Sequence, residues 1–156
     1  MTFRKPALAL LAAAVALPVV GDPAAVPHAL ARRGCTQEDV PALELFLTHD
    51  AYDGKGEPPK PYLHMELAWG DFTKLVGRDL DLIPLSRQGV DRSKLLVRAE
   101  AAPAQGASVW LSGRLRLSRV VVDQRVEGSY RFIAPDQTVW VGKFTASWVA
   151  GPHTCG

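Results

Sequence analysis

SVWLSGRLRLSRVVVDQRVEGSYRFIAPDQTVWVGKFTASWV, residues 108–149, is the stretch that decides the fold of this chain. Successive side chains of a β-strand point to opposite faces, so residues of one parity share the buried face. Leu115 and Leu117 have one parity, and the alternation recurs around Tyr130 and Phe132 and again around Phe144. Aromatic and β-branched residues, which favour strands, are frequent throughout. The stretch therefore predicts a three-strand antiparallel meander.

The first hairpin of this meander is expected to turn at Asp123 and Gln124. A two-residue turn there pairs Leu117 with Tyr130 on the core face, and a four-residue loop around the same two residues keeps this pairing. On the other face Arg116 then lies opposite Arg131, a like-charge pair that is unfavourable unless an anion lies between them.

The second hairpin is expected to have a three-residue loop over 135–137. Its usual form is a type I turn followed by a left-handed residue, here Gln137. This loop pairs Phe132 with Trp140, whereas a two-residue loop would turn the Trp140 face away from the core.

The rest of the chain contains further short alternating segments. Strands are predicted over 42–48, 62–69, 79–85 and 93–101, and one helical turn within 70–78. The length of 108–122 predicts a bend near Gly113 or Ser118. Together these segments predict an all-β fold, a single antiparallel β-sandwich or barrel of about seven strands.

The N-terminus has the pattern of a secretory signal. Arg4 and Lys5 precede an apolar run over 7–17, and small residues follow before Gly21. The run is too short to span a bilayer. We expect residues 1–21 to be a cleaved signal peptide, 22–34 an irregular leader and 35–156 a single β domain. The expected location is the periplasm or the medium, with no transmembrane segment in the mature chain.

Charge gives no support for nucleic-acid binding. The formal net charge of the whole chain is +2, and it includes Arg4 and Lys5. The mature chain is therefore near neutral, without the excess of positive charge that attracts a phosphate backbone.

The two cysteines are Cys35 and Cys155. An even number of cysteines in an exported chain predicts a disulfide between them. Lipid attachment at Cys35 is disfavoured because Arg32-Arg33-Gly34 precedes it, and the spacing does not fit a metal site.

One candidate metal or acid–base site combines His49, His64 and Glu66. His64 and Glu66 share the face of one predicted strand, and His49 lies across a hairpin from them. The loop over 49–57 is rich in carboxylates and glycines, but its spacing does not fit an EF-hand and a polar hairpin loop explains it equally. A solvated His–Glu pair remains the alternative.

A candidate ligand-binding face combines Trp110 with Arg114, Arg116 and Arg131. Trp110 has the parity of the two nearby arginines, so it is the tryptophan expected to be exposed and available for stacking on a sugar. The three arginines are expected to cluster on the outer face of the meander, where they would attract an anion. A solvated strand face is the alternative.

The function expected is that of an exported, non-catalytic β domain that binds a protein or an envelope component. No Gly-x-Ser-x-Gly elbow, Walker motif or dinucleotide-binding glycine pattern occurs, and no cofactor is expected. The alternatives are a module that binds a carbohydrate or small ligand through exposed aromatics, and a hydrolase or metal-dependent enzyme that uses the histidine site.

Overall fold

The structure, a computed structural model, describes residues 27–36, 40–68, 71–83, 95–151 and 155. The expected signal peptide lies outside these residues, as does Trp69. The described chain is all-β, with one short 3-10 helix, η2 (Phe72–Leu75). The strands are β1 (His28–Cys35), β2 (Pro41–Thr48), β3 (Tyr62–Ala68), β4 (Asp79–Asp81), β5 (Leu96–Ala102), β6 (Val109–Trp110), β7 (Ser112–Val121), β8 (Arg125–Ile133) and β9 (Val139–Trp148).

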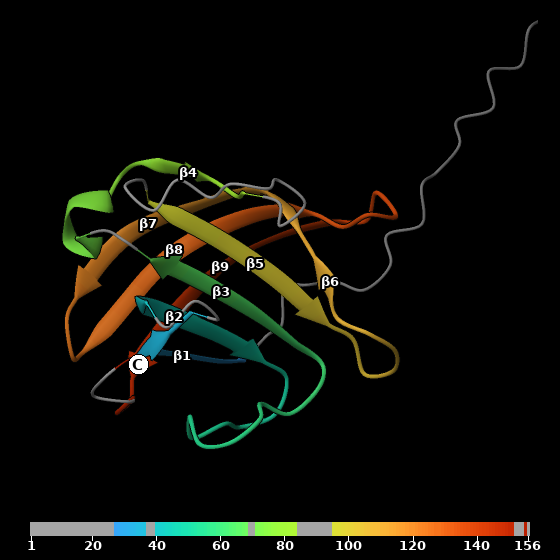
Figure 1. Ribbon diagram of the computed structural model, residues 1–156, viewed down its shortest axis with the longest axis horizontal. Coiled ribbons are helices and arrows are strands. Elements are labelled where there is room, and N and C mark those ends of the chain that lie inside the picture. The colour runs from blue at the N-terminus through green and yellow to red at the C-terminus, as the bar shows by residue number, and fades with distance from the viewer. Residues whose placement is uncertain (1–26, 37–39, 69–70, 84–94, 152–154, 156) are drawn as a thin grey trace, which may run out of the picture.

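The nine strands form one mixed sheet in the order β4-β7-β8-β9-β1-β2-β3-β5-β6. The all-β prediction is confirmed. The expectation of about seven strands is wrong, and so is that of a wholly antiparallel arrangement, because β1 and β9 pair in parallel. Neither a sandwich nor a barrel is confirmed, because the strands form one sheet and this sheet is not closed. The two halves of the sheet face each other (Figure 1).

The curvature of the sheet places its core between the two halves. Figure 1 shows β2, β3 and β5 in front of β7, β8 and β9. The main cluster of buried apolar side chains draws on both sets, including Leu45, Met65 and Val97 from one and Leu115 and Phe132 from the other. We call β4, β7, β8 and β9 the first half of the sheet, and the other five strands the second half.

β1 includes residues 28–34, for which an irregular leader was expected, so that expectation does not hold there. Leu30 and Ala31 are both buried although they are neighbours in sequence. A strand buried at consecutive positions has no alternation, and alternation is the signal that sequence reasoning uses.

The second hairpin has the predicted register. Phe132 lies opposite Trp140, and the same register continues along both strands to Val126 opposite Ala146. Ala134 N donates to Thr138 O across the loop, and Gln137 has a φ of 70°. The left-handed conformation predicted for Gln137 is thus confirmed.

Gln137→Gly is expected to leave the protein as stable as before or up to about 1 kcal/mol more stable. A non-glycine residue in this conformation costs roughly 1–2 kcal/mol, whereas glycine adds unfolded-state entropy worth about 0.5–1 kcal/mol. Gln137→Val should destabilise, since a β-branched residue resists positive φ. Urea unfolding of both variants measures this. A loss above about 1 kcal/mol for glycine would contradict it.

The first hairpin differs from the expected register. Its loop has three residues, with Val121 opposite Arg125, and Asp123 takes a φ of 61°. A bulge between Leu117 and Arg119 then shifts the pairing, so that Leu117 lies opposite Gly128. The error is one residue between the loop and the bulge and two residues from Leu117 back to Ser112. Two is an even number, so the buried face of that longer part was assigned correctly.

The long segment that precedes this hairpin bends where a bend was expected. The bulge falls at Ser118, and Gly113 has a φ of 120°. A further break at Leu111 separates β6 from β7, and Leu111 N donates to Ala99 O of β5 at 2.9 Å. The short helical turn is also confirmed, with Asp71 as its N-cap.

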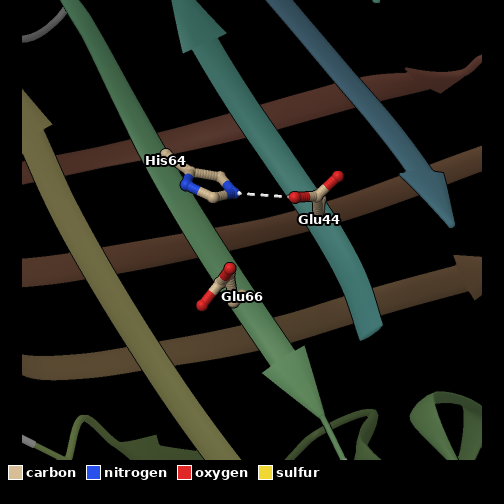
Figure 2. Close-up of side chains that lie close together, drawn as sticks. All are labelled: Glu44, His64 and Glu66. Atoms are coloured by element: carbon tan, nitrogen blue, oxygen red, sulfur yellow. Dashed lines mark ion pairs between the residues drawn. The ribbon is translucent and has the colours of Figure 1, made fainter. Parts of the chain in front are cut away.

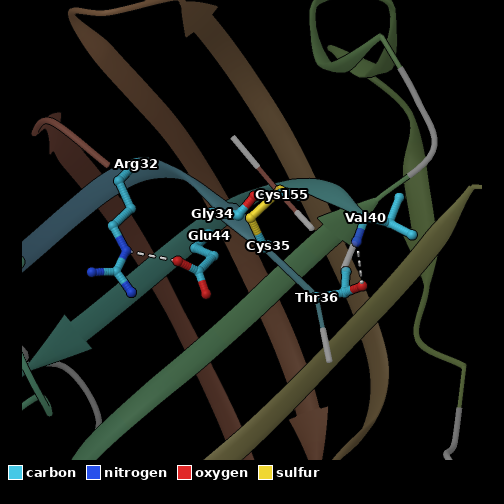
Figure 3. The surroundings of a disulfide bond; sticks show 7 residues. All are labelled: Arg32, Gly34, Cys35, Thr36, Val40, Glu44 and Cys155. Atoms are coloured by element: carbon cyan, nitrogen blue, oxygen red, sulfur yellow. Dashed lines mark hydrogen bonds and ion pairs between the residues drawn. A yellow bond between two sulfur atoms is a disulfide. The ribbon is translucent and has the colours of Figure 1, made fainter. Parts of the chain in front are cut away.

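The predicted disulfide between Cys35 and Cys155 is present (Figure 3). It joins the end of β1 to the C-terminal segment across a sequence separation of 120 residues. Val149 N donates to Ala31 O, so the two terminal segments also meet through their backbones. The bridge thus links the end of β1 covalently to the segment that follows β9, the two strands that pair in parallel.

Candidate functional site

The outer face of the first half carries most of the predicted ligand-binding residues. Cross-strand pairing aligns them in two adjacent rows, Asp79–Arg116–Ser129–Lys143 and Asp81–Arg114–Arg131–Val141. Arg114 therefore lies directly opposite Arg131, in place of the expected pair of Arg116 with Arg131. A like-charge pair was predicted at Arg131 and is present, but its partner is Arg114 and not Arg116.

A hollow of about 400 Å³ lies over these rows. It is lined by Asp79, Arg114, Arg116, Ser129, Tyr130, Arg131, Val141, Gly142 and Lys143. We call it the basic hollow, since four cationic side chains and one carboxylate line it. All three predicted arginines contribute to it, and Lys143 joins them because the second hairpin places it diagonally from Arg131.

The four cations of the basic hollow are not equivalent. Arg114 Nε lies 2.8 Å from Asp81 Oδ1, and Arg116 Nη1 lies 3.0 Å from Asp79 Oδ1. Neither Arg131 nor Lys143 has an ion pair with any residue that the structure describes. These two side chains carry the positive charge that an anion would meet.

Trp110 does not join the basic hollow. It lies on the edge strand β6, opposite Glu100 of β5, and its side chain is 39% exposed. The guanidinium of Arg98 lies 5.9 Å from the centre of its ring, within the range of a cation–π contact. The sequence correctly predicted an exposed tryptophan, but the structure separates it from the three arginines.

The outer face of the second half carries a row of charged side chains, of which three are buried and Arg32 is half-buried. Register aligns Arg32, Glu44, Glu66 and Arg98 on four adjacent strands. Arg32 Nε lies 2.6 Å from Glu44 Oε2, and Arg98 Nε lies 3.1 Å from Glu66 Oε2. The two carboxylates are thus flanked by two guanidinium groups.

His64 occupies the neighbouring row. Its Nε2 lies 3.4 Å from Glu44 Oε1 (Figure 2), and its Nδ1 lies 3.6 Å from Glu100 Oε1. The ring stacks on Phe46 with centroids 4.3 Å apart. Burial alone would lower the pKa of His64, but the neighbouring carboxylates of Glu100, Glu44 and Glu66 outweigh burial and raise the pKa to about 9.

The structure brings together two of the three residues predicted for a metal or acid–base site. His64, Glu66 and Glu44 offer ligand atoms that all lie within 4.8 Å of one another. His49 is elsewhere, exposed and paired with Asp50 at 3.1 Å. Sequence reasoning missed Glu44, although it lies on the polar face of β2 directly across from Glu66.

These side chains form an ionic network. A metal ion would have to displace the proton of His64, since only the neutral imidazole coordinates. It would also compete with Arg32 and Arg98 for the two carboxylates. Among the described residues, and with His64 protonated, three cations face the three carboxylates of Glu44, Glu66 and Glu100.

The network predicts a loss of stability as the pH rises through about 9. The pKa of His64 is raised from 6.5 to about 9, so its contribution is complete below about 6.5 and is lost towards and above about 9. The contribution is roughly 3 kcal/mol at most. His64→Gln should unfold with a smaller difference between pH 6.5 and pH 9.5 than the parent chain. Equal pH dependence of the two proteins in urea unfolding would contradict this.

No protein-family model matches the sequence, and comparisons with curated proteins and solved structures find no match. Within the described residues there is no helix long and apolar enough to span a membrane. The functional argument therefore depends on the chemistry of the sites themselves.

Proposed function

We propose that the chain is an exported, non-catalytic β domain that binds an anionic group of a protein or envelope component at the basic hollow. Export is supported by the charged and apolar N-terminal pattern, and the disulfide is compatible with an oxidising compartment. The observation that carries the proposal is the pair of cations, Arg131 and Lys143, without an ion-pair partner among the described residues.

The arrangement of charge supports a bound anion. Arg114 and Arg131 are direct cross-strand neighbours, and like charges in this relation destabilise a sheet. The ion pair with Asp81 offsets the charge of Arg114 but not that of Arg131. Arg131 and Lys143 are diagonal neighbours on β8 and β9. Diagonal neighbours of a sheet lie about 7–8 Å apart, within reach of long side chains, so both can contact one anion.

A second candidate function is carbohydrate binding at Trp110. An exposed tryptophan on a sheet edge offers a face for stacking on a sugar ring. The exposure of 39% favours this function, whereas the contact with Arg98 occupies part of the same side chain.

The double variant Arg131→Gln/Lys143→Gln is expected to abolish the increase in melting temperature that sulfate, phosphate or polyglutamate produces in the parent chain. The matched control is Arg119→Gln, an exposed arginine of β7 that does not line the basic hollow. It should respond like the parent. The proposal fails if none of the anions stabilises the parent chain, or if the double variant responds as the parent does.

A further inference from the structure

β9 has one fully paired edge and one largely open edge. Nine of its ten residues, from Val139 to Ser147, pair with β8. On the other side β1 pairs with Ser147 and Trp148 alone. No other strand of the described residues pairs with β9. Among the described residues, the segment from Val139 to Thr145 therefore has no strand paired to its second edge, although β9 lies in the middle of the sheet. We call this the open edge of β9.

The direction of the backbone groups on this edge follows from the hydrogen bonds at its end. Trp148 N donates to Gln124 O on the β8 side, and Val149 N donates to Ala31 O on the β1 side. Because alternate residues of a strand direct their backbone groups to the same side, the odd-numbered residues face the open edge. These are Val139, Val141, Lys143 and Thr145.

The open edge has little of the protection that strand edges usually carry. It contains no proline and one charged side chain, Lys143. Val139 is 45% exposed and Val141 is 54% exposed, among the highest values for large apolar residues in the described chain. A hollow of about 260 Å³ lined by His28, Thr145 and Ser147 lies where β1 first meets β9.

The positive charge beside this edge favours an acidic binding partner. Val141 and Lys143 line the basic hollow, and Arg131 lies opposite Val141 on β8. A second copy of the chain paired edge to edge would bring two sets of these cations together. An acidic strand would instead place its outward side chains beside Lys143 and Arg131.

We propose that the open edge of β9 binds an extended acidic segment of a protein partner as an added β-strand. This inference rests on the proposed function, since it takes the partner's carboxylates as the anions of the basic hollow. Backbone hydrogen bonds to the odd-numbered residues supply affinity, and alternation of acidic and apolar side chains supplies specificity.

The test uses the full chain recovered after export and a blocked peptide of eight residues that alternates valine with glutamate. In the free protein, amide hydrogen exchange should be fast at Val139, Val141 and Lys143 and slow at Trp140 and Gly142. The peptide should slow exchange at the odd-numbered amides. A peptide with lysine in place of glutamate, and one N-methylated at alternate residues, should leave that exchange unchanged.

A variant pair separates the edge from the basic hollow. Val139→Pro removes an edge donor outside the basic hollow and away from the β8 ladder, and Val139→Ala keeps that donor. Proline should weaken peptide binding by about tenfold or more, while both variants keep the response to sulfate. The N-methylated peptide gives the same test without altering the protein, should the proline variant fail to fold.

Three results would overturn the inference. If sulfate binds but the peptide protects none of the odd-numbered amides, the added strand is wrong and the proposed function stands. If neither binds, both fail. Slow exchange of the odd-numbered amides in the free protein would identify another occupant: a second copy if the protection depends on protein concentration, and another part of this chain if it does not.

Discussion

Replacing both Cys35 and Cys155 with serine is expected to lower the free energy of unfolding by about 4–5 kcal/mol. The bridge closes a loop with a sequence separation of 120 residues, and loops of this length remove the most entropy from the unfolded chain. A loss of this size is a large fraction of the stability of a small domain. Urea unfolding of the oxidised parent and the double variant measures it directly.

The control for this prediction is the parent chain with its disulfide reduced. It should unfold at the same urea concentration as the double variant, because both lack the same constraint. A loss below about 1 kcal/mol would show that the unfolded chain gains little freedom without the bridge.

Arg98→Met is expected to lower the free energy of unfolding by about 3–5 kcal/mol, because it removes one partner of a buried ion pair. The Arg98 side chain is only 2% exposed, and its Nε lies 3.1 Å from Glu66 Oε2. Methionine leaves the Glu66 carboxylate buried without this cation. Urea unfolding at pH 7 gives the loss.

Two comparisons isolate the effect of burial. Arg114→Met breaks a similar pair with Asp81 on the outer face of the first half, where the side chains are 67% and 77% exposed. This variant should lose about 1 kcal/mol or less. Adding Glu66→Gln to Arg98→Met should restore part of the lost stability, since the uncompensated charge is gone. Equal losses for Arg98→Met and Arg114→Met would refute a buried ionic network.

The second hairpin shows what the sequence can predict. Pro135 restricts the turn, and a slip of one residue would expose Trp140 and Phe144, so loop length and register follow from local residues. The first hairpin lacks these constraints. Its bulge at Ser118 depends on how β7 curves around the core, and curvature is a property of the whole sheet.

The candidate sites were predictable to a different extent. The place of the three arginines on one outer face follows from strand parity, which a two-residue error in register does not alter. Lys143 could have been added from the predicted second hairpin, which places it diagonally from Arg131. Glu44 required the knowledge that β2 and β3 pair with Glu44 opposite Glu66. The parallel contact of β1 with β9 joins segments more than one hundred residues apart, and no local pattern encodes that pairing.

The most direct test of anion binding at the basic hollow is a titration of the exported chain with sulfate, followed through its amide spectrum. We predict that the largest shifts occur at Arg131, Lys143 and Arg114, and that Arg131→Gln/Lys143→Gln removes them. Amides near Trp110 and Arg119 should not respond. Shifts that are absent, or that concentrate around Trp110, would contradict the proposed binding site.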